Sequence, residues 1–218
     1  MKHSISNMWL LGLVALFIFV FAGFLAVTIS YSVAFKTKNE MLNIIEKHNG
    51  LTYSTRTSTT SGQYSGQSVI TGLGTLQTLN AYLYGMGYKV KSVCPSNEQH
   101  GTKNVVWYGI KDLKVGDWNN FSGVAEKAVA GKKYYYCVSK YYSVYCENGK
   151  AVNVKKNMNA AYYKVQIFYK MDLPVLGDIF TFKIDGTTAD IYYPIDQTDQ
   201  NTFRKVIQEV STEVDCTS

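Results

Sequence analysis

The sequence is poor in the residues that most enzyme sites need. Its 218 residues include only 3 histidines, and His3, His48 and His100 are far apart in the chain. Histidine triads and histidine-rich metal sites need several such side chains that converge. G-x-S-x-G, H-E-x-x-H, EF-hand and Walker patterns are also missing. We therefore predict a non-catalytic protein with no catalytic residues, no metal site, no cofactor, and no nucleic-acid or small-molecule partner.

Charge is missing from one long stretch. Residues 8–35 contain no Asp, Glu, Lys, Arg or His over 28 positions. A membrane-spanning helix needs ~20 apolar residues, whereas the core of a signal peptide has only ~7–15. We predict a transmembrane helix over residues 8–35 after a short cytoplasmic start at 1–7, with cleavage after Ala26 as the alternative. The helix is expected to continue as a stem over 36–50 and to stop at Asn49 and Gly50.

Small residues recur at every fourth position inside this apolar stretch. On a helix, such a spacing forms a nearly continuous ridge on one side. Ridges of small side chains let two membrane helices approach closely, because packing drives their association in lipid. The ridge predicts a contact with another membrane helix, either a second copy or a partner, through Ala22, Ala26, Ser30 and Ala34. The alternative is that small residues are simply common in membrane helices.

The 4 cysteines contain no C-x-x-C pair and no histidine at a zinc-ligand spacing. An even number of cysteines beyond an apolar N-terminus indicates disulfides in an oxidising compartment. Of the three possible pairings we favour Cys94 with Cys137, and Cys146 with Cys216. A hairpin staple between Cys137 and Cys146, or four buried free thiols, would be the alternatives.

The orientation in the membrane rests on two opposing signals. Lys36 and Lys38 follow the apolar stretch, and the positive-inside rule would place them in the cytoplasm. The cysteines favour the reverse, and long domains are translocated largely regardless of charge. We expect a cytoplasmic N-terminus and an extracellular C-terminal domain at the cell membrane. The net charge of +6 is a mild excess spread over the chain, and we expect it to form a solvated face with no partner; attraction to an anionic surface is the alternative.

The rest of the chain reads as a linker followed by an α+β domain. Residues 51–66 are rich in Ser, Thr and Gly and predict a linker. Within the domain, 67–218, apolar residues at a helical spacing from Ile70 to Leu83 predict one helix. A second short helix is expected near 203–210. The segments between them alternate as strands of a mainly antiparallel sheet, with tight turns at 148–149 and 185–186. The strand over 162–171 is expected to be half exposed.

The layout of the chain resembles a family of bacterial surface proteins. An uncharged helix with the extension "SYSVAFKTKNEMLNIIEKHNG" precedes "GYKVKSVCP", "YYYCV" and "YYKVQIFYKMDLPVLGDIFTFKIDGTTADIYYP". This arrangement is similar to TadE-like, pilin-like proteins of Gram-positive bacteria, the minor pseudopilins of tight-adherence pili. The most specific part is a strand–loop–strand motif that includes Pro174, Gly177, Asp178 and Gly186.

The resemblance implies a membrane helix bundled with other pilin-like helices and a domain displayed outside. Pilin precursors carry a glutamate shortly after the processing glycine, whereas this sequence has no acid before Glu40. An unprocessed, permanently anchored structural or assembly component is therefore the expected function. A tethered adhesion module for an anionic polymer or host ligand is the alternative, and an exported enzyme of unfamiliar type is a third hypothesis.

Overall fold

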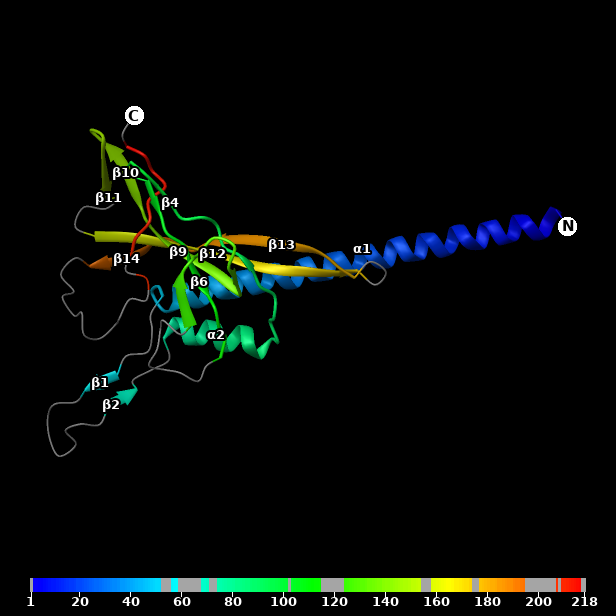
Figure 1. Cartoon of the computed structure of the whole chain (residues 1–218), viewed down its shortest axis with the longest axis horizontal. Helices are drawn as coiled ribbons and strands as arrows, with labels where there is room; N and C mark the ends of the chain where they lie inside the picture. Colours follow the sequence, from blue (N-terminus) through cyan, green and yellow to red (C-terminus); the bar gives the residue numbers. More distant parts are fainter. Residues whose placement is uncertain are drawn as a thin grey trace.

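The computed structural model describes residues 2–51, 56–58, 68–70, 74–101, 103–114, 124–153, 158–173, 177–194, 207 and 209–216. It consists of one long helix whose second half packs against a mainly antiparallel sheet (Figure 1). A short second helix lies beside the first on the same domain. The predicted α+β fold class is therefore confirmed.

The first helix, α1 (Lys2–Lys47), has 46 residues. At 1.5 Å per residue it is about 70 Å long. Among the described residues, it is the one helix long and apolar enough to cross a membrane. Its end is where the sequence predicts it, because Asn49 adopts a φ of 53° and the Gly50 N–H donates to the Ile45 carbonyl at 2.9 Å. This geometry satisfies a carbonyl that the helix leaves unpaired.

The second helix, α2 (Thr75–Gly85), is shorter than the leucine spacing suggests. Its C-terminus is as predicted, since Gly87 has a φ of +70° and the Tyr88 N–H donates to the Leu83 carbonyl at 3.0 Å. Ile70, in contrast, lies in a short strand and not in the helix. The 3.6-residue period therefore holds for Leu76, Leu79 and Leu83, which are buried, but not for Ile70.

The main sheet is antiparallel and has the strand order β13-β12-β9-β6-β7, with β14 also paired to β12. The described residues also form four separate two-stranded pairs. The strands of the main sheet are β6 (Tyr108–Ile110), β7 (Ala125–Lys127), β9 (Tyr136–Tyr142), β12 (Met158–Leu173), β13 (Gly177–Thr187) and β14 (Ile191–Pro194). The smaller pairs are β1 (Arg56–Ser58) with β2 (Ser68–Ile70), β3 (Ser92–Val93) with β8 (Lys133–Tyr134), β4 (Glu98–His100) with β5 (Lys103–Val105), and β10 (Val144–Glu147) with β11 (Lys150–Asn153).

Both faces of the central strands are covered. Val165 and Ile167 belong to the core that the two helices close, whereas Phe168 belongs to a second core on the opposite face. The second core also contains Trp107 and the buried ring of Tyr134. The prediction of a half-exposed strand is thus wrong, since Phe168 is 0 % and Gln166 only 5 % exposed. The periodicity of the strand does not reveal the polar-rich segments that cover its second face.

One predicted turn is present and the other is not. Asn148 and Gly149 connect β10 to β11 with φ angles of 52° and 69°, as the sequence predicts. Asp185 and Gly186, in contrast, lie inside β13, where they pair with Gln166 and Val165. Gly186 lets α1 lie close to β13 and does not reverse the direction of the chain.

Two disulfides join distant parts of the domain. Cys94 is bonded to Cys137 and Cys146 to Cys216, which is the pairing favoured from the sequence. The bonds close loops of 43 and 70 residues, and in the chain-entropy account each stabilises the fold by about 4 kcal/mol. The predicted helix near 203–210 lies mostly outside the described residues; Ser211, just beyond it, forms a β-bridge with Tyr141.

Several tyrosines pack inside the sheet layers and predict alkaline instability. Burial raises the pKa of Tyr141 and of Tyr162 to about 12, and it also raises the pKa of Tyr88 and of Tyr136. An unfolded tyrosine ionises near pH ~10. The stability that these groups contribute is therefore complete below pH ~10 and is lost as the pH rises towards about 12.

We expect the ultraviolet absorbance of tyrosinate to rise in two steps. Exposed tyrosines ionise first with an unchanged circular dichroism spectrum, and the buried ones ionise together with the loss of that spectrum. A single step near the ordinary tyrosine pKa, with the fold intact, would contradict this assignment.

Candidate functional site at the junction of the helix and the sheet

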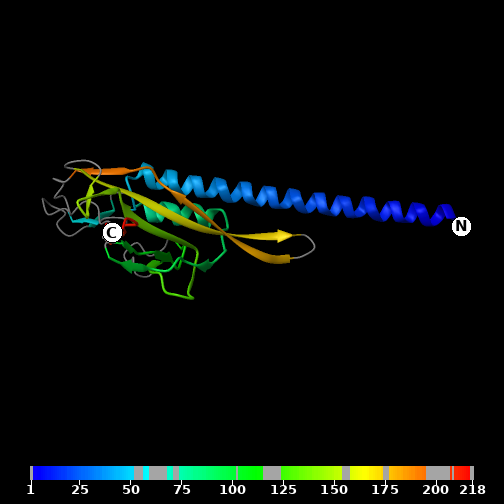
Figure 2. The same cartoon turned by 90° about the horizontal axis from the view of Figure 1, so that it is seen from above.

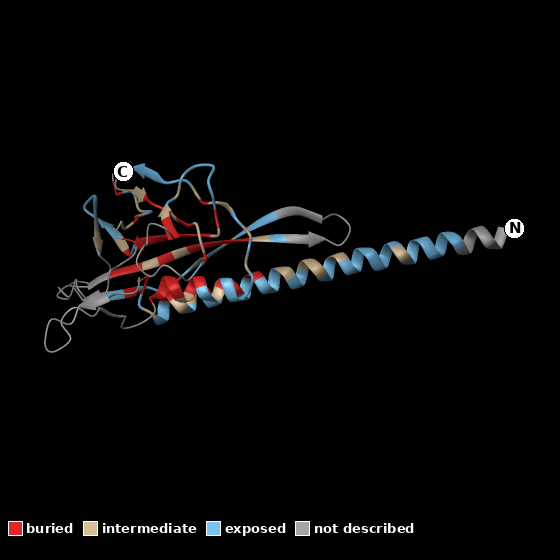
Figure 3. Ribbon diagram, turned by 60° about the horizontal axis from the view of Figure 1, so that its bottom comes forward, coloured by how far each residue is buried: buried red, intermediate tan, exposed pale blue. Residues whose placement is uncertain are grey.

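The stem of α1 is built into the domain by one stripe of buried residues. Ala34, Thr37, Met41 and Ile45 follow a helical spacing and are almost completely buried, with Met41 and Ile45 at 0 % exposure. Figure 3 shows this change along the helix, which is exposed over its N-terminal part and buried where it meets the sheet. Because Met41 and Ile45 belong to the main core, the helix cannot leave the domain without opening that core.

Thr37 is a buried polar residue in the N-terminal half of this stripe. Its hydroxyl donates to the Val33 carbonyl at 2.9 Å and shares a second hydrogen bond with the Tyr169 hydroxyl, also at 2.9 Å. The Met86 sulfur lies 4.0 Å away, so α1, α2 and β12 meet at this one side chain. A buried hydroxyl that loses its partner is costly, so this contact fixes the rotation of α1 relative to the sheet.

Tyr88 completes the sheet where one strand pairing ends. The pairing of β9 with β12 stops at Ile167. Beyond it, the Tyr88 hydroxyl accepts from the Phe168 N–H at 3.0 Å and donates to the Phe168 carbonyl at 2.6 Å. Buried backbone groups need such partners, so this side chain takes the place of a neighbouring strand.

Gly186 lies at the point where α1 passes over the edge strand. A Cβ atom at this position would lie 2.8 Å from Leu42 Cδ1 and 2.8 Å from Lys38 Cδ. A larger residue at this position would require the side chains of Leu42 and Lys38 to move. Further along, Glu46 of α1 accepts a hydrogen bond from the Ala189 N–H at 2.7 Å.

The structure divides the predicted ridge of small residues between two environments. Ala34 is buried within the chain and forms part of the junction. Ala26 and Ser30 are partly buried, and Ala22 is exposed on the apolar half of α1. Ala22, Ala26 and Ser30 are therefore the part of the ridge that is left for contact with another helix.

The predicted strand–loop–strand motif forms the end of the β12–β13 hairpin. Gly177 pairs with Leu173, and Asp178 pairs with Asp172. Pro174 lies outside the described residues. Gly186, the last residue of the motif, belongs to the helix junction, far from the hairpin end.

The described ion pairs involve none of the residues of the junction. Glu126 contacts Lys111 and Lys132, and the hydrogen bond from Lys132 lowers the pKa of the Glu126 carboxyl. Among the described residues no group of three His, Cys, Asp or Glu side chains is placed to hold a metal ion. His100 is exposed in β4, and His48 follows the end of α1. The junction is thus a packing site, built from Thr37, Tyr169, Tyr88 and Gly186.

Sequence reasoning missed Thr37, Tyr169 and Tyr88. The one available signal for Thr37 is its place between two lysines on the same helix face as Ala34 and Met41. Tyr88 and Tyr169 carry no local signal among 18 tyrosines.

Comparison with known proteins leaves the family of the chain open. No family model matches the sequence, and neither a curated protein nor a solved structure shows significant similarity to it.

The close approach at Gly186 predicts a specific loss of stability. Gly186→Val would place side-chain atoms where Leu42 and Lys38 lie. We expect a loss of about 1–3 kcal/mol in the free energy of unfolding, as for other overpacked sites. The measurement is urea unfolding of the purified protein in detergent, followed by circular dichroism.

Gly85→Val is the matched control, because a Cβ at Gly85 has nothing within 4 Å, and the expected change is within ~0.5 kcal/mol. Leu42→Ala should relieve part of the loss in the double variant. Equal stability of the Gly186 and Gly85 variants would refute the close approach.

The buried hydroxyl of Thr37 predicts a second effect. Thr37→Val keeps the shape of the side chain but leaves the Tyr169 hydroxyl without this partner, at a cost of about 1 kcal/mol. We expect faster hydrogen exchange of backbone amides in residues 36–47, measured by mass spectrometry. Thr28→Val is the control, because the exposed Thr28 hydroxyl makes the same 2.9 Å bond to the carbonyl four residues earlier. If both variants exchange alike, Thr37 does not fix the junction.

Proposed function

We propose that this protein is a membrane-anchored, pilin-like structural or assembly component of a pilus-like or secretion apparatus. It is non-catalytic, packs through its N-terminal helix, and displays its domain on the extracellular side. The TadE-like resemblance of the sequence supports the pilin-like assignment. The two disulfides support an oxidising environment for the domain.

The observation that carries this proposal is the continuity of α1. The same unbroken helix contains the apolar segment and the stem, and the stem contributes Met41 and Ile45 to the core of the domain. Membrane segment and domain are therefore coupled as one rigid unit. A subunit that assembles through its membrane helix needs this coupling, because helix packing must then determine where the domain is placed. A domain on a simple tether does not need it.

A tethered adhesion module remains the second candidate. Three large aromatic side chains, Tyr142, Tyr145 and Tyr192, are exposed on β9, β10 and β14. These strand segments lie towards the end of the domain opposite the N-terminus of α1 (Figure 1). Exposed aromatic residues are common in binding surfaces, so a ligand for this end would make α1 only an anchor.

Photo-crosslinking from two positions separates the candidates. A photoreactive phenylalanine analogue at Phe19 lies on the same helix face as Ala26, and one at Tyr145 lies on the outer end of the domain. Assembly through α1 predicts that Phe19 captures a second copy or another small membrane protein in intact cells. Capture from Tyr145 alone would support the adhesion module and refute assembly through the helix.

Ala26→Leu should reduce the capture from Phe19, because the larger side chain prevents close approach of two helices. Val14→Leu is the matched control, since Val14 lies about 120° away around the helix. Capture that is unaffected by Ala26→Leu would contradict the role of the ridge.

A further inference from the structure

The hairpin of β12 and β13 extends beyond the rest of the domain. Figures 1 and 2 show it running beside the apolar part of α1, towards the N-terminal end of the helix. Its strands stay paired as far as Leu173 and Gly177. The end of this hairpin therefore projects in the direction of the membrane.

The lengths of the two elements show how far the hairpin reaches. Val165 pairs with Gly186, the residue that lies against Lys38 and Leu42 of α1. From Val165 to Leu173 the strand covers about 26 Å, whereas α1 covers only about 10 Å from Leu42 to Phe35. The hairpin end thus passes Phe35, the last residue of the uncharged stretch.

A hairpin of this kind cannot lie inside the hydrocarbon of a bilayer. Among the described residues, β13 is the edge strand of its sheet, and β12 has no strand neighbour on the β9 side beyond Ile167. Open sheet edges do not occur in lipid, because each unpaired backbone group costs several kcal/mol there. Asp172 and Asp178 lie directly opposite one another near the hairpin end and add two charges. The membrane boundary must therefore lie nearer the N-terminus than Phe35.

The composition of α1 places this boundary near Val27. Residues 8–27 contain no hydroxyl group, and these 20 residues match the ~20 that a span requires. Hydroxyls then follow in quick succession at Thr28, Ser30, Tyr31 and Ser32. We infer that the hydrocarbon ends near Val27 and that the end of the β12–β13 hairpin rests on the lipid headgroups beside residues 28–35.

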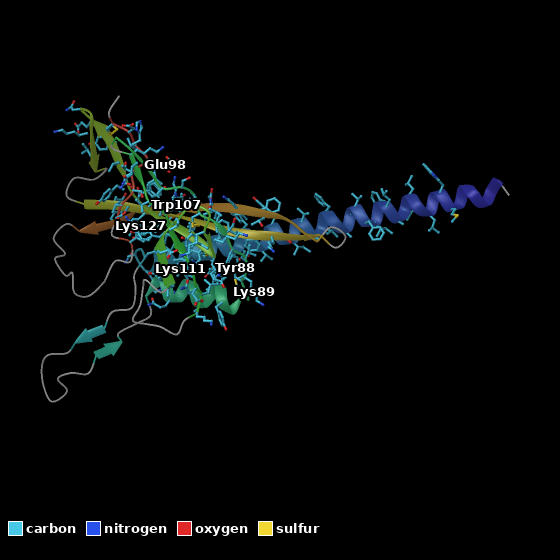
Figure 4. All side chains as sticks on the ribbon, viewed as in Figure 1. Tyr88, Lys89, Glu98, Trp107, Lys111 and Lys127 are labelled. Atoms are coloured by element: carbon cyan, nitrogen blue, oxygen red, sulfur yellow. A yellow bond between two sulfur atoms is a disulfide. The ribbon has the colours of Figure 1, made fainter. Side chains whose placement is uncertain are left out.

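Lysines on this side of the domain fit a headgroup surface. Lys170 and Lys183 are exposed on the hairpin, and Phe182 beside them is 42 % exposed. Lys89 follows the end of α2, lies nearer the N-terminal end of α1 than Lys127 in Figure 4, and forms no ion pair with another described residue. Lys127, in contrast, lies away from this side and is paired with Glu209. Lysines near the membrane surface are attracted to anionic lipids.

The depth of α1 can be measured with a water-soluble maleimide on the full chain in liposomes of phosphatidylglycerol and phosphatidylethanolamine. Ser32 and Val14 lie on the same helix face, five turns apart. We expect Ser32→Cys to be labelled and Val14→Cys to stay unlabelled. An unlabelled Ser32→Cys would overturn the boundary near Val27. Labelling of Val14→Cys would show that α1 does not insert, which would also refute membrane anchoring.

The lipid contact of the hairpin is tested with photoreactive lipids in the same liposomes. Lipids with a diazirine near the headgroup should form adducts on the β12–β13 hairpin peptide, within residues 168–173 or 177–183. The peptide of the β10–β11 hairpin is the control, because this hairpin lies at the other end of the domain (Figure 1). Equal adduct formation on both peptides, or crosslinks from the β12–β13 hairpin only to a second copy, would overturn the inference. The inference depends on membrane insertion of α1 and not on the pilin-like role, so a failed capture from Phe19 would leave it intact.

Discussion

The rest of the structure depends on the burial of the α1 stem against the sheet. Most of the stability of a helix in a protein comes from tertiary packing of one of its faces, and the stem half of α1 has such a face. Met41 and Ile45 provide this packing, Thr37 fixes the rotation, and Gly186 permits the close distance. The two helices together close one core, and the disulfide-linked segment around Cys94 closes the other. Without the stem, the helix side of the main core would be open to water.

Much of the fold follows from local sequence patterns. The absence of charge over 8–35 predicts the apolar helix, and Asn49 with Gly50 predicts its end. Alternating residues predict most of the strands, because side chains point to opposite faces at every second position. The cysteines lie in segments that the sheet brings together, although sequence alone leaves their pairing open.

The details of the junction could not be predicted in this way. Asp185 and Gly186 look like a turn, because the same two residues favour a tight reversal wherever the chain permits one. These two residues instead lie inside β13, where Gly186 contacts α1, a helix 140 or more residues earlier in the chain. No local pattern predicts a contact between residues so far apart in the sequence. The burial of Phe168 and Gln166 has the same origin, since the cover on the second face comes from Trp107 and its neighbours. Thr37 and Tyr88 act through hydrogen bonds that form only after the elements have packed.

The unbroken course of α1 has a mechanical consequence. The helix contains no proline, and a helix without a break transmits torsion along its axis because each turn is hydrogen-bonded to the next. A rotation or shift of its N-terminal half would therefore be passed on to the domain, because Met41 and Ile45 of the same helix lie in the domain core.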